Sequence, residues 1–292
     1  MKLGLQIDHF DWPGSPANIG ETLTRIGSAA DEAGLASLWV MDHFYQIRGI
    51  GPVEDPMLEA YTTLGYLEAC TRRIRLGTLV TGIVYRHPGI LIKTATTLDV
   101  LSGGRSYFGV GAAWFEREAL GLGVPFPSTK TRFEVLEETL QVLRRMWDDD
   151  RQPYPGRHLQ LAEPLVRPQP LSRPHPSILI GGGGERKTLR LVAQYADACN
   201  LFADDLNAMR RKLDVLRRHC DNVGRAYEEI ERTALGTLKI GSSRSEVEDM
   251  LARCRSLSEA GIQHFIFSIP NVHEMELLKI LERDVIPAVA EL

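Results

Sequence analysis

The sequence lacks several features that would point to a secreted, membrane-bound or metal-binding protein. Its 292 residues include only four cysteines, which lie far apart and form no Cys-x-x-Cys pair, so neither a disulfide framework nor a zinc knuckle is indicated. No run of eighteen apolar residues occurs, and the first residues read as a strand without a signal-type segment. We therefore expect a cytoplasmic protein with no membrane partner.

The chain also has little excess of charge of either sign. The chain has 34 Lys and Arg against 38 Asp and Glu, a formal net charge of −4 with no long run of like charge. Such a chain offers no basic surface to a phosphodiester backbone, so nucleic acid is not an expected partner. The histidines form no ligand-spaced pair, and no metal is expected.

Short apolar runs do alternate with longer amphipathic patterns along the whole chain. Eight of these runs are typical of buried parallel strands, at 3–7, 37–41, 74–80, 105–111, 177–181, 198–202, 233–241 and 262–269. Helical patterns lie between them, for example at 19–33, 58–70, 133–147, 209–222 and 246–257. Eight such units predict an α/β fold, a closed (β/α)8 TIM barrel that forms a single domain over residues 1–292.

Two segments are too long for plain connections and are predicted as insertion loops over the C-terminal face of the barrel. Residues 148–177 contain seven prolines, so this stretch cannot be a helix, and we expect an ordered excursion over the barrel mouth. Residues 43–56 carry Gly49, Gly51 and Pro52 and are expected to act as a lid.

Ligand-binding groups of such barrels collect at the C-terminal ends of the strands. Polar, aromatic or glycine-rich motifs follow several predicted strands, namely Asp42-His43, Thr81-Gly82, Arg86-His87-Pro88, Ala112-Ala113-Trp114 and Gly181-Gly182-Gly183-Gly184. Their common place at strand ends predicts one site at this rim.

The four glycines favour a phosphate site. A glycine-rich turn that leads into a helix lets backbone N–H groups approach an anion, and Arg186 and Lys187 follow after Glu185. The alternative is a connection in which glycine only permits tight packing.

The other rim residues each allow a functional and a structural interpretation. His43 could carry a proton and Asp42 could orient it, or the pair could be a helix cap beside a partly buried imidazole. Trp114 could stack on a planar ligand or plug the rim. Arg86 and His87 are candidate substrate contacts, with a helix cap as the alternative. Glu116 and Glu118 could serve as acids, but exposed loop glutamates are usually only solvated, and that is the expectation for both.

Three stretches, in this order, resemble the luciferase-like monooxygenase superfamily, and within it the oxidoreductases that depend on the deazaflavin F420. They are WVMDHF at 39–44, IRLGTLVTGIVYRHPGILIKTATTLDVLSGGRSYFGVGAAWFERE at 74–118 and ILIGGGGERKTLRLVAQYADACNLF at 178–202. The resemblance implies F420 as cofactor, with FMN as the alternative, and a homodimer as in many relatives.

The resemblance also implies a role for each rim motif. Asp42 would contact the deazaflavin, and His43 would be the catalytic proton carrier near its reactive carbon. Leu79 and Val80 would flank a bulge behind the ring, often with a non-proline cis peptide. The other cofactor contacts would come from Thr81, Gly82, Ala112, Ala113, Trp114, Gly181, Gly182, Gly183 and Gly184.

One departure from the family pattern concerns the substrate. Trp114 stands where the sugar-phosphate dehydrogenases of this family have a catalytic Glu. We therefore expect hydride transfer between F420 and a small organic substrate, contacted by Trp114, Arg86 and His87, and not sugar-phosphate oxidation. The alternatives are an FMN-dependent flavin monooxygenase and a flavin-binding barrel without turnover.

Overall fold

The computed structural model describes residues 1–238 and 243–292. Within these ranges the main sheet is closed and all its neighbouring strands are parallel, in the order β3-β2-β1-β11-β10-β9-β8-β5-β4, with β3 also paired to β5. Its strands are β1 (Lys2–Ile7), β2 (Ser37–Val40), β3 (Arg75–Thr78), β4 (Thr81–Gly82), β5 (Ser106–Gly111), β8 (Ser177–Gly181), β9 (Ala198–Phe202), β10 (Glu231–Thr237) and β11 (His264–Ser268). Because β4 follows β3 along the same stave, the sheet has eight staves.

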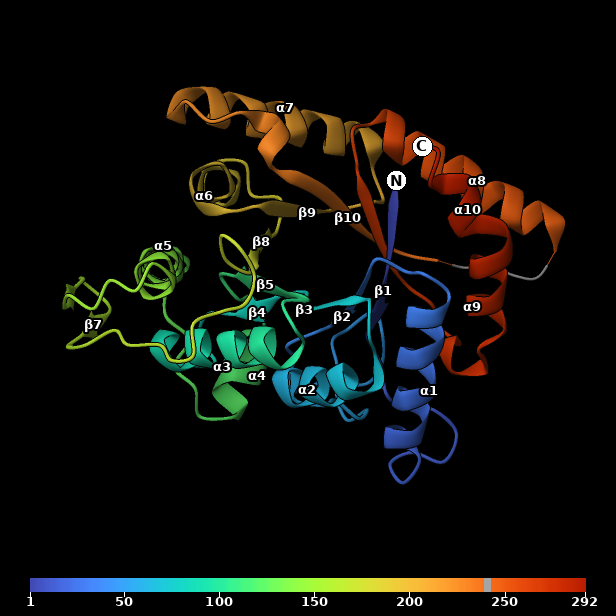
Figure 1. Ribbon diagram of the computed structural model, residues 1–292, viewed down its shortest axis with the longest axis horizontal. Coiled ribbons are helices and arrows are strands. Elements are labelled where there is room, and N and C mark those ends of the chain that lie inside the picture. The colour runs from blue at the N-terminus through green and yellow to red at the C-terminus, as the bar shows by residue number, and fades with distance from the viewer. Residues whose placement is uncertain (239–242) are drawn as a thin grey trace.

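Helices surround this sheet, as Figure 1 shows. They are α1 (Ile19–Glu32), α2 (Ala60–Cys70), α3 (Pro88–Leu101), α4 (Glu116–Gly121), α5 (Thr129–Trp147), α6 (Thr188–Tyr195), α7 (Leu206–Val223), α8 (Arg244–Glu259), α9 (Glu276–Ile280) and α10 (Ile286–Val289). The predicted (β/α)8 barrel is confirmed.

Helix α7 illustrates how the local sequence forms these elements. Its buried residues are Met209, Leu213, Leu216 and Cys220, one stripe at helical spacing that faces the sheet. The Asp205 side chain accepts hydrogen bonds from two backbone N–H groups at the N-terminus. Gly224 ends the helix with a φ of 68°, a left-handed conformation that glycine adopts without steric cost.

Most predicted strands agree with the observed ones to within one or two residues, and two deserve comment. The strand expected at 74–80 ends at Thr78 and is followed by a cis Leu79–Val80 peptide bond and then β4. A non-proline cis bond at this place is what the resemblance implied. The strand expected at 233–241 is observed as β10, and residues 239–241 lie outside the described residues.

The proline-rich segment 148–177 does not cover the barrel mouth, and that expectation was wrong. It includes a small hairpin of β6 (Tyr154–Pro155) and β7 (Gln160–Leu161) and packs on the outside of the barrel. The backbone N–H groups of Leu171 and Ser172 donate to Asp99 of α3 at 2.7 and 3.0 Å, and His175 stacks on Trp147 of α5. Since α5 returns the chain to the N-terminal end of the barrel, the connection to β8 never has to cross the mouth.

The barrel interior is packed with side chains, as in other barrels of this class. An inner cluster of buried apolar residues comprises Trp39, Leu79, Tyr107, Leu179, Ala198 and Ile266. The larger cluster lies between the sheet and the helices. In the described ranges no helix is both long and apolar enough to cross a bilayer.

Candidate functional site

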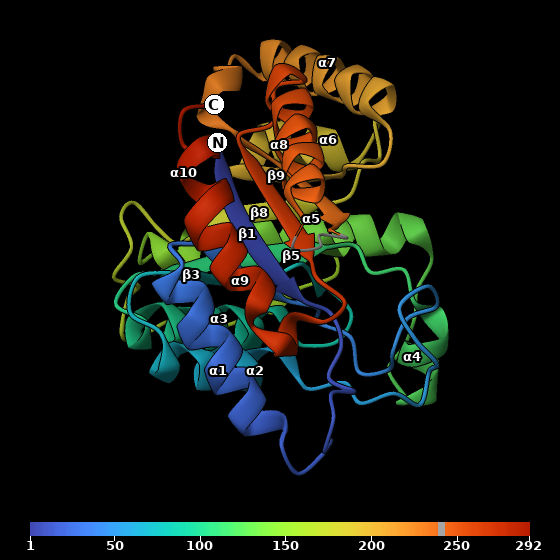
Figure 2. The ribbon, with the colours of Figure 1, turned by 90° about the vertical axis from the view of Figure 1, so that its right-hand side faces the viewer.

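A cavity of about 740 Å³ opens at the C-terminal ends of the strands. It brings together every residue that the sequence analysis assigned to catalysis or cofactor binding, namely Asp42, His43, Leu79, Val80, Thr81, Gly82, Ala112, Ala113, Trp114, Gly181, Gly182, Gly183 and Gly184. The loop after β2 borders the same cavity through Ile47, Arg48, Gly49 and Ile50. In Figure 2, α4 and the chain around it lie on the side of the barrel away from both chain ends.

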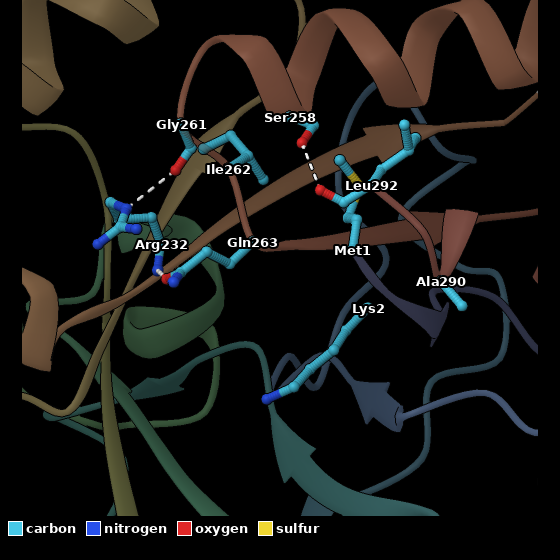
Figure 3. A pocket seen from close by; sticks show the side chains of 9 residues that line it. All are labelled: Met1, Lys2, Arg232, Ser258, Gly261, Ile262, Gln263, Ala290 and Leu292. Carbon is cyan, nitrogen blue, oxygen red and sulfur yellow. Dashed lines mark hydrogen bonds between the residues drawn. The ribbon is translucent and has the colours of Figure 1, made fainter. Parts of the chain in front are cut away.

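A second cavity, of about 550 Å³, lies at the opposite end of the barrel. It is lined by residues next to both chain ends, among them Met1, Lys2, Arg232, Gln263 and Leu292 (Figure 3). None of the rim motifs contributes to its lining. The convergence of the motifs therefore selects the C-terminal cavity as the candidate site.

His43 is held by a buried carboxylate from α4. Its Nδ1 lies 3.1 Å from Oε1 of Glu118, a residue with no exposed surface. The same oxygen accepts a hydrogen bond from the Tyr85 hydroxyl, while Oε2 accepts the backbone N–H groups of Phe44 at 2.6 Å and Tyr45 at 2.8 Å. Glu118 thus ties the end of β2, the chain after β4 and helix α4 together.

The expectation that Glu118 is a solvated loop residue was wrong. Burial by itself raises the pKa of Glu118, but hydrogen bonds from His43, Tyr85 and the Tyr45 backbone outweigh this effect, so its pKa lies below the usual value. Glu116, two residues earlier, is exposed as expected. The sequence carried no clear signal for Glu118, because its burial depends on how the short helix α4 packs against the segment that follows β2.

Asp42 faces the cavity but does not orient His43. Both of its carboxylate oxygens accept hydrogen bonds from Arg86, at 2.6 and 2.9 Å, and Arg86 also contacts Glu59. Burial raises the pKa of Asp42 and the hydrogen bonds from Arg86 oppose that rise; the bidentate geometry favours the ionised pair. Asp42 is only 2% exposed, so this pair is largely a buried ion pair beneath the cavity wall.

The structure does not bring Arg86 and His87 to the cavity lining, which corrects the expectation that they contact substrate. Arg86 is occupied by its two carboxylate partners. His87 is the N-cap of α3, and its Nδ1 accepts the N–H of Gly89 at 3.3 Å. The helix-cap alternative is therefore the observed one.

The glycine turn, Gly181 to Gly184, also lines the cavity. Gly182 has a φ of 110°, and within the described chain the N–H groups of Gly183 and Gly184 have no protein acceptor. A Cβ at Gly183 would lie 2.6 Å from Nζ of Lys212, so the ammonium group sits against this turn. Two open N–H donors beside a cation form a cradle for an anion.

A second cation, Arg132, was also missed by the sequence analysis and lines the cavity. Arg132 of α5 is nearly buried, and its guanidinium donates to the carbonyls of Ala112 at 3.0 Å and Pro127 at 2.6 Å. Among the described residues no carboxylate lies within ion-pair distance of Arg132 or Lys212. Arg186 and Lys187, which the sequence favoured for this role, are exposed and do not line the cavity.

Aromatic side chains flank the opening. Trp114 and Phe202, from the ends of β5 and β9, line the cavity and remain 60% and 61% exposed. Trp114 stacks on Phe115, with ring centroids 5.1 Å apart, and its edge meets the His43 ring at 5.5 Å. Large aromatic surfaces left open to solvent at a cavity suit a flat or apolar ligand.

No group of three His, Cys, Asp or Glu side chains in the described part of the chain is arranged to hold a metal ion. The polar groups of the cavity instead suit an organic ligand that carries an anionic group: an anion cradle at one end, a wall of small residues, and a held imidazole with aromatic rings at the other.

Two relatives show what kind of protein this chain is similar to. The F420-dependent glucose-6-phosphate dehydrogenase of Kineococcus radiotolerans is 28% identical over 211 residues, which are 70% of this chain and 59% of the relative. A phthiodiolone/phenolphthiodiolone dimycocerosates ketoreductase of a Mycobacterium species is 30% identical over 257 residues, or 79% of this chain and 64% of the relative. The matches thus span less than two thirds of either relative's length.

Among solved structures, an F420-dependent secondary alcohol dehydrogenase in complex with an F420–acetone adduct superposes with a TM-score of 0.83. The two chains are 19% identical, and the alignment covers 99% of this chain and 98% of the other. At that identity the likeness concerns the fold. The family model for luciferase-like monooxygenases matches residues 1–284. The chain therefore belongs to the luciferase-like monooxygenase family.

Proposed function

We propose that this protein is an F420-dependent oxidoreductase that transfers a hydride between the deazaflavin and a small organic alcohol, carbonyl compound or activated alkene. The observation that carries the proposal is the single cavity with an anion cradle at one end and the His43–Glu118 pair at the other. A phosphate-bearing planar cofactor fits these two ends. Several relatives, among them the Kineococcus radiotolerans enzyme, are named as F420-dependent, which supports the same cofactor here.

The residues present match the parts of such a cofactor. Gly183, Gly184, Lys212 and Arg132 would hold its phosphate, while Val80, Gly82 and Ala113 would lie along its ring system. When bound, the deazaflavin supplies two-electron hydride chemistry. Glycine at 181 leaves room beside Val80, because a Cβ there would lie 2.8 Å from a Val80 methyl group.

His43 would handle the proton of the reaction. When an alcohol is oxidised, its hydroxyl proton passes to Nε2 of His43 as the hydride leaves the carbon, and the imidazolium returns a proton when a carbonyl is reduced. The negative charge of Glu118 stabilises the imidazolium that forms. The aromatic rings of Trp114 and Phe115 against the imidazole limit access of water.

We further propose that the substrate is flat or apolar and is not a sugar phosphate, although several similar relatives are F420-dependent glucose-6-phosphate dehydrogenases. Trp114 places an aromatic ring where those enzymes have a catalytic Glu. Among residues 1–238 and 243–292, the charged groups that line the cavity besides His43 are Arg48, Arg132, Asp8, Asp42 and Asp204, with acids in excess. If Arg132 binds the phosphate of the cofactor, the charged groups left to contact a substrate phosphate are mostly carboxylates.

Fluorescence titration of the purified protein with F420 and FMN tests the cofactor assignment. We expect saturable F420 binding that weakens when the deazaflavin lacks its phosphate, and turnover with secondary alcohols or ketones but not with glucose 6-phosphate. Tight FMN binding with negligible F420 binding would contradict the proposal. Oxygen consumption with a supply of reduced FMN would then identify a monooxygenase, for which the family match is the supporting observation.

We also propose a homodimer. Tyr66 of α2 and Ile90 and Leu101 of α3 are large apolar side chains that stay 45%, 63% and 62% exposed on neighbouring helices. A partner copy would bury them. Sedimentation at micromolar concentration tests this, and a monomer there would contradict it.

A further inference from the structure

Glu118 has no surface exposure and yet makes four contacts across the wall of the candidate site. An ionised carboxylate has only acceptor atoms, so all four partners must donate to it. For the Tyr85 hydroxyl and the two backbone N–H groups this is unambiguous. For His43 it means that Nδ1 carries a hydrogen whenever Glu118 is charged, since a neutral imidazole holds its single hydrogen on one nitrogen only.

The geometry leaves the other imidazole nitrogen for the reaction. His43 lines the cavity, and among the described residues Nε2 has no hydrogen-bond partner. The ring is held from three sides, by Glu118 at Nδ1 and by the edges of Trp114 and Phe115 at 5.5 and 5.9 Å. An imidazole fixed at one nitrogen and open at the other is prepared to accept a proton at the open nitrogen.

We propose that Glu118 is a positioning residue for His43, holding its hydrogen on Nδ1 so that the lone pair of Nε2 faces the substrate. The inference rests on the proposed role of His43. It assigns to Glu118 a function that the family pattern, with its acid four residues earlier at the place of Trp114, does not suggest. Tyr85 supports the same carboxylate by donating to the oxygen that His43 uses.

The charged and titratable groups around His43 permit this role. Asp42 precedes it in the chain, but its charge is engaged by Arg86. Tyr85 approaches through Glu118, and burial beside this carboxylate raises the pKa of its hydroxyl, so it stays a neutral donor. Glu118 is therefore the one carboxylate, among the described residues, in direct contact with the imidazole.

Nitrogen NMR of the His43 ring in the full chain tests the proposal directly, with and without F420. We expect the neutral ring to carry hydrogen on Nδ1. A neutral ring with hydrogen on Nε2 would overturn the proposal. This measurement needs no turnover, so a wrong cofactor or substrate assignment would not disturb it, and it does not depend on whether any variant folds.

Glu118→Gln provides the kinetic test. The amide can donate to Nδ1, which favours the hydrogen on Nε2, so we expect kcat to fall about 100-fold while KM changes little. In the same variant, nitrogen NMR should show the neutral His43 ring with its hydrogen on Nε2. Glu118→Asp, which keeps a carboxylate acceptor, should recover part of kcat and return the hydrogen to Nδ1.

The matched control is Glu116→Gln, on the same short helix but exposed. It should leave kcat and the hydrogen on Nδ1 of His43 unchanged. If Glu118→Gln folds and lowers kcat while the neutral ring keeps its hydrogen on Nδ1, the carboxylate serves only to hold the loop through Phe44 and Tyr45, and the positioning role is wrong.

Discussion

Two imidazole–carboxylate pairs lie at opposite ends of this barrel and are built from the same groups. At the C-terminal rim, His43 pairs with Glu118. At the N-terminal floor, Nδ1 of His264 lies 3.4 Å from Glu231, and its Nε2 lies 2.8 Å from the Ser37 hydroxyl. Ser37, His264 and Glu231 are thus linked in space as serine, histidine and acid, as in the triads of nucleophilic enzymes.

The two ends differ in access. Ser37 and His264 have no exposed surface, and the Ser37 oxygen already accepts the Trp39 indole N–H at 2.6 Å. Glu231 is occupied by Lys2 and by the Tyr107 hydroxyl, each at 2.9 Å. His43, in contrast, lines a cavity of about 740 Å³. A group of reactive residue types therefore does not by itself indicate a catalytic site. A cavity beside the group, from which a ligand can reach it, is also needed.

The largest expected effect is that of His43→Ala. Hydride transfer should fall about 100- to 10,000-fold because the proton has no other carrier at this wall. The free energy of unfolding should change by less than about 1 kcal/mol, since the ring is partly exposed. Single-turnover kinetics and urea unfolding measure the two quantities, and full activity in the variant would remove His43 from the mechanism.

Arg86 belongs to the C-terminal rim but does not line the cavity, so we expect its substitution, like one at the N-terminal floor, to affect mainly the free energy of unfolding. Arg86→Met leaves Asp42 buried without its cation, so we expect a loss of about 3–5 kcal/mol in the free energy of unfolding. Arg117→Met, at an exposed position of α4, is the control and should change it by less than about 0.5 kcal/mol. Equal stability of the two variants would show that the buried pair is dispensable.

We expect the His264–Glu231 pair at the N-terminal floor to contribute to the free energy of unfolding. This contribution should depend on pH. Burial raises the pKa of Glu231, but His264 and Lys2 outweigh this and hold it well below the usual value. A lowered pKa stabilises the fold above the ordinary glutamate pKa, and this contribution is lost as pH falls towards the folded-state pKa.

We therefore expect Glu231→Gln to lower the free energy of unfolding by about 1–3 kcal/mol at neutral pH, and by less as the pH drops below about 4. Activity per folded molecule should stay the same. Denaturant unfolding at pH 7 and at pH 3 measures the difference, with exposed Glu259→Gln as control. A difference that does not change with pH would contradict the assignment.

The smallest effect concerns glycine. Gly182→Ala at the anion cradle forces a side chain into a φ of 110°, which should cost about 1–3 kcal/mol of stability and weaken cofactor binding. Gly65→Ala in α2 meets no atom within 4 Å and should stabilise the protein by about 0.5–1 kcal/mol. Opposite signs in thermal unfolding would separate a required glycine from a tolerated one.

The sequence alone predicted most of the architecture and the place of the site. Apolar periodicity is local, so eight strands and their helices could be read from it, and parallel strands necessarily bring their C-terminal ends to one rim. That is why Asp42, His43, Trp114 and the four glycines were expected together and are found on one cavity.

Only the tertiary structure decided which partner each side chain has. Asp42 is adjacent to His43 in sequence but turns to Arg86, while Glu118, which lies 75 residues away, holds the imidazole. Likewise Lys212 lies against the glycine turn and Arg132 lines the cavity, whereas the neighbouring Arg186 and Lys187 do neither. Hydrogen bonds and ion pairs depend on distances of about 3 Å between segments remote in the chain, and such distances are set by the packing of helices on the barrel, which local patterns do not encode.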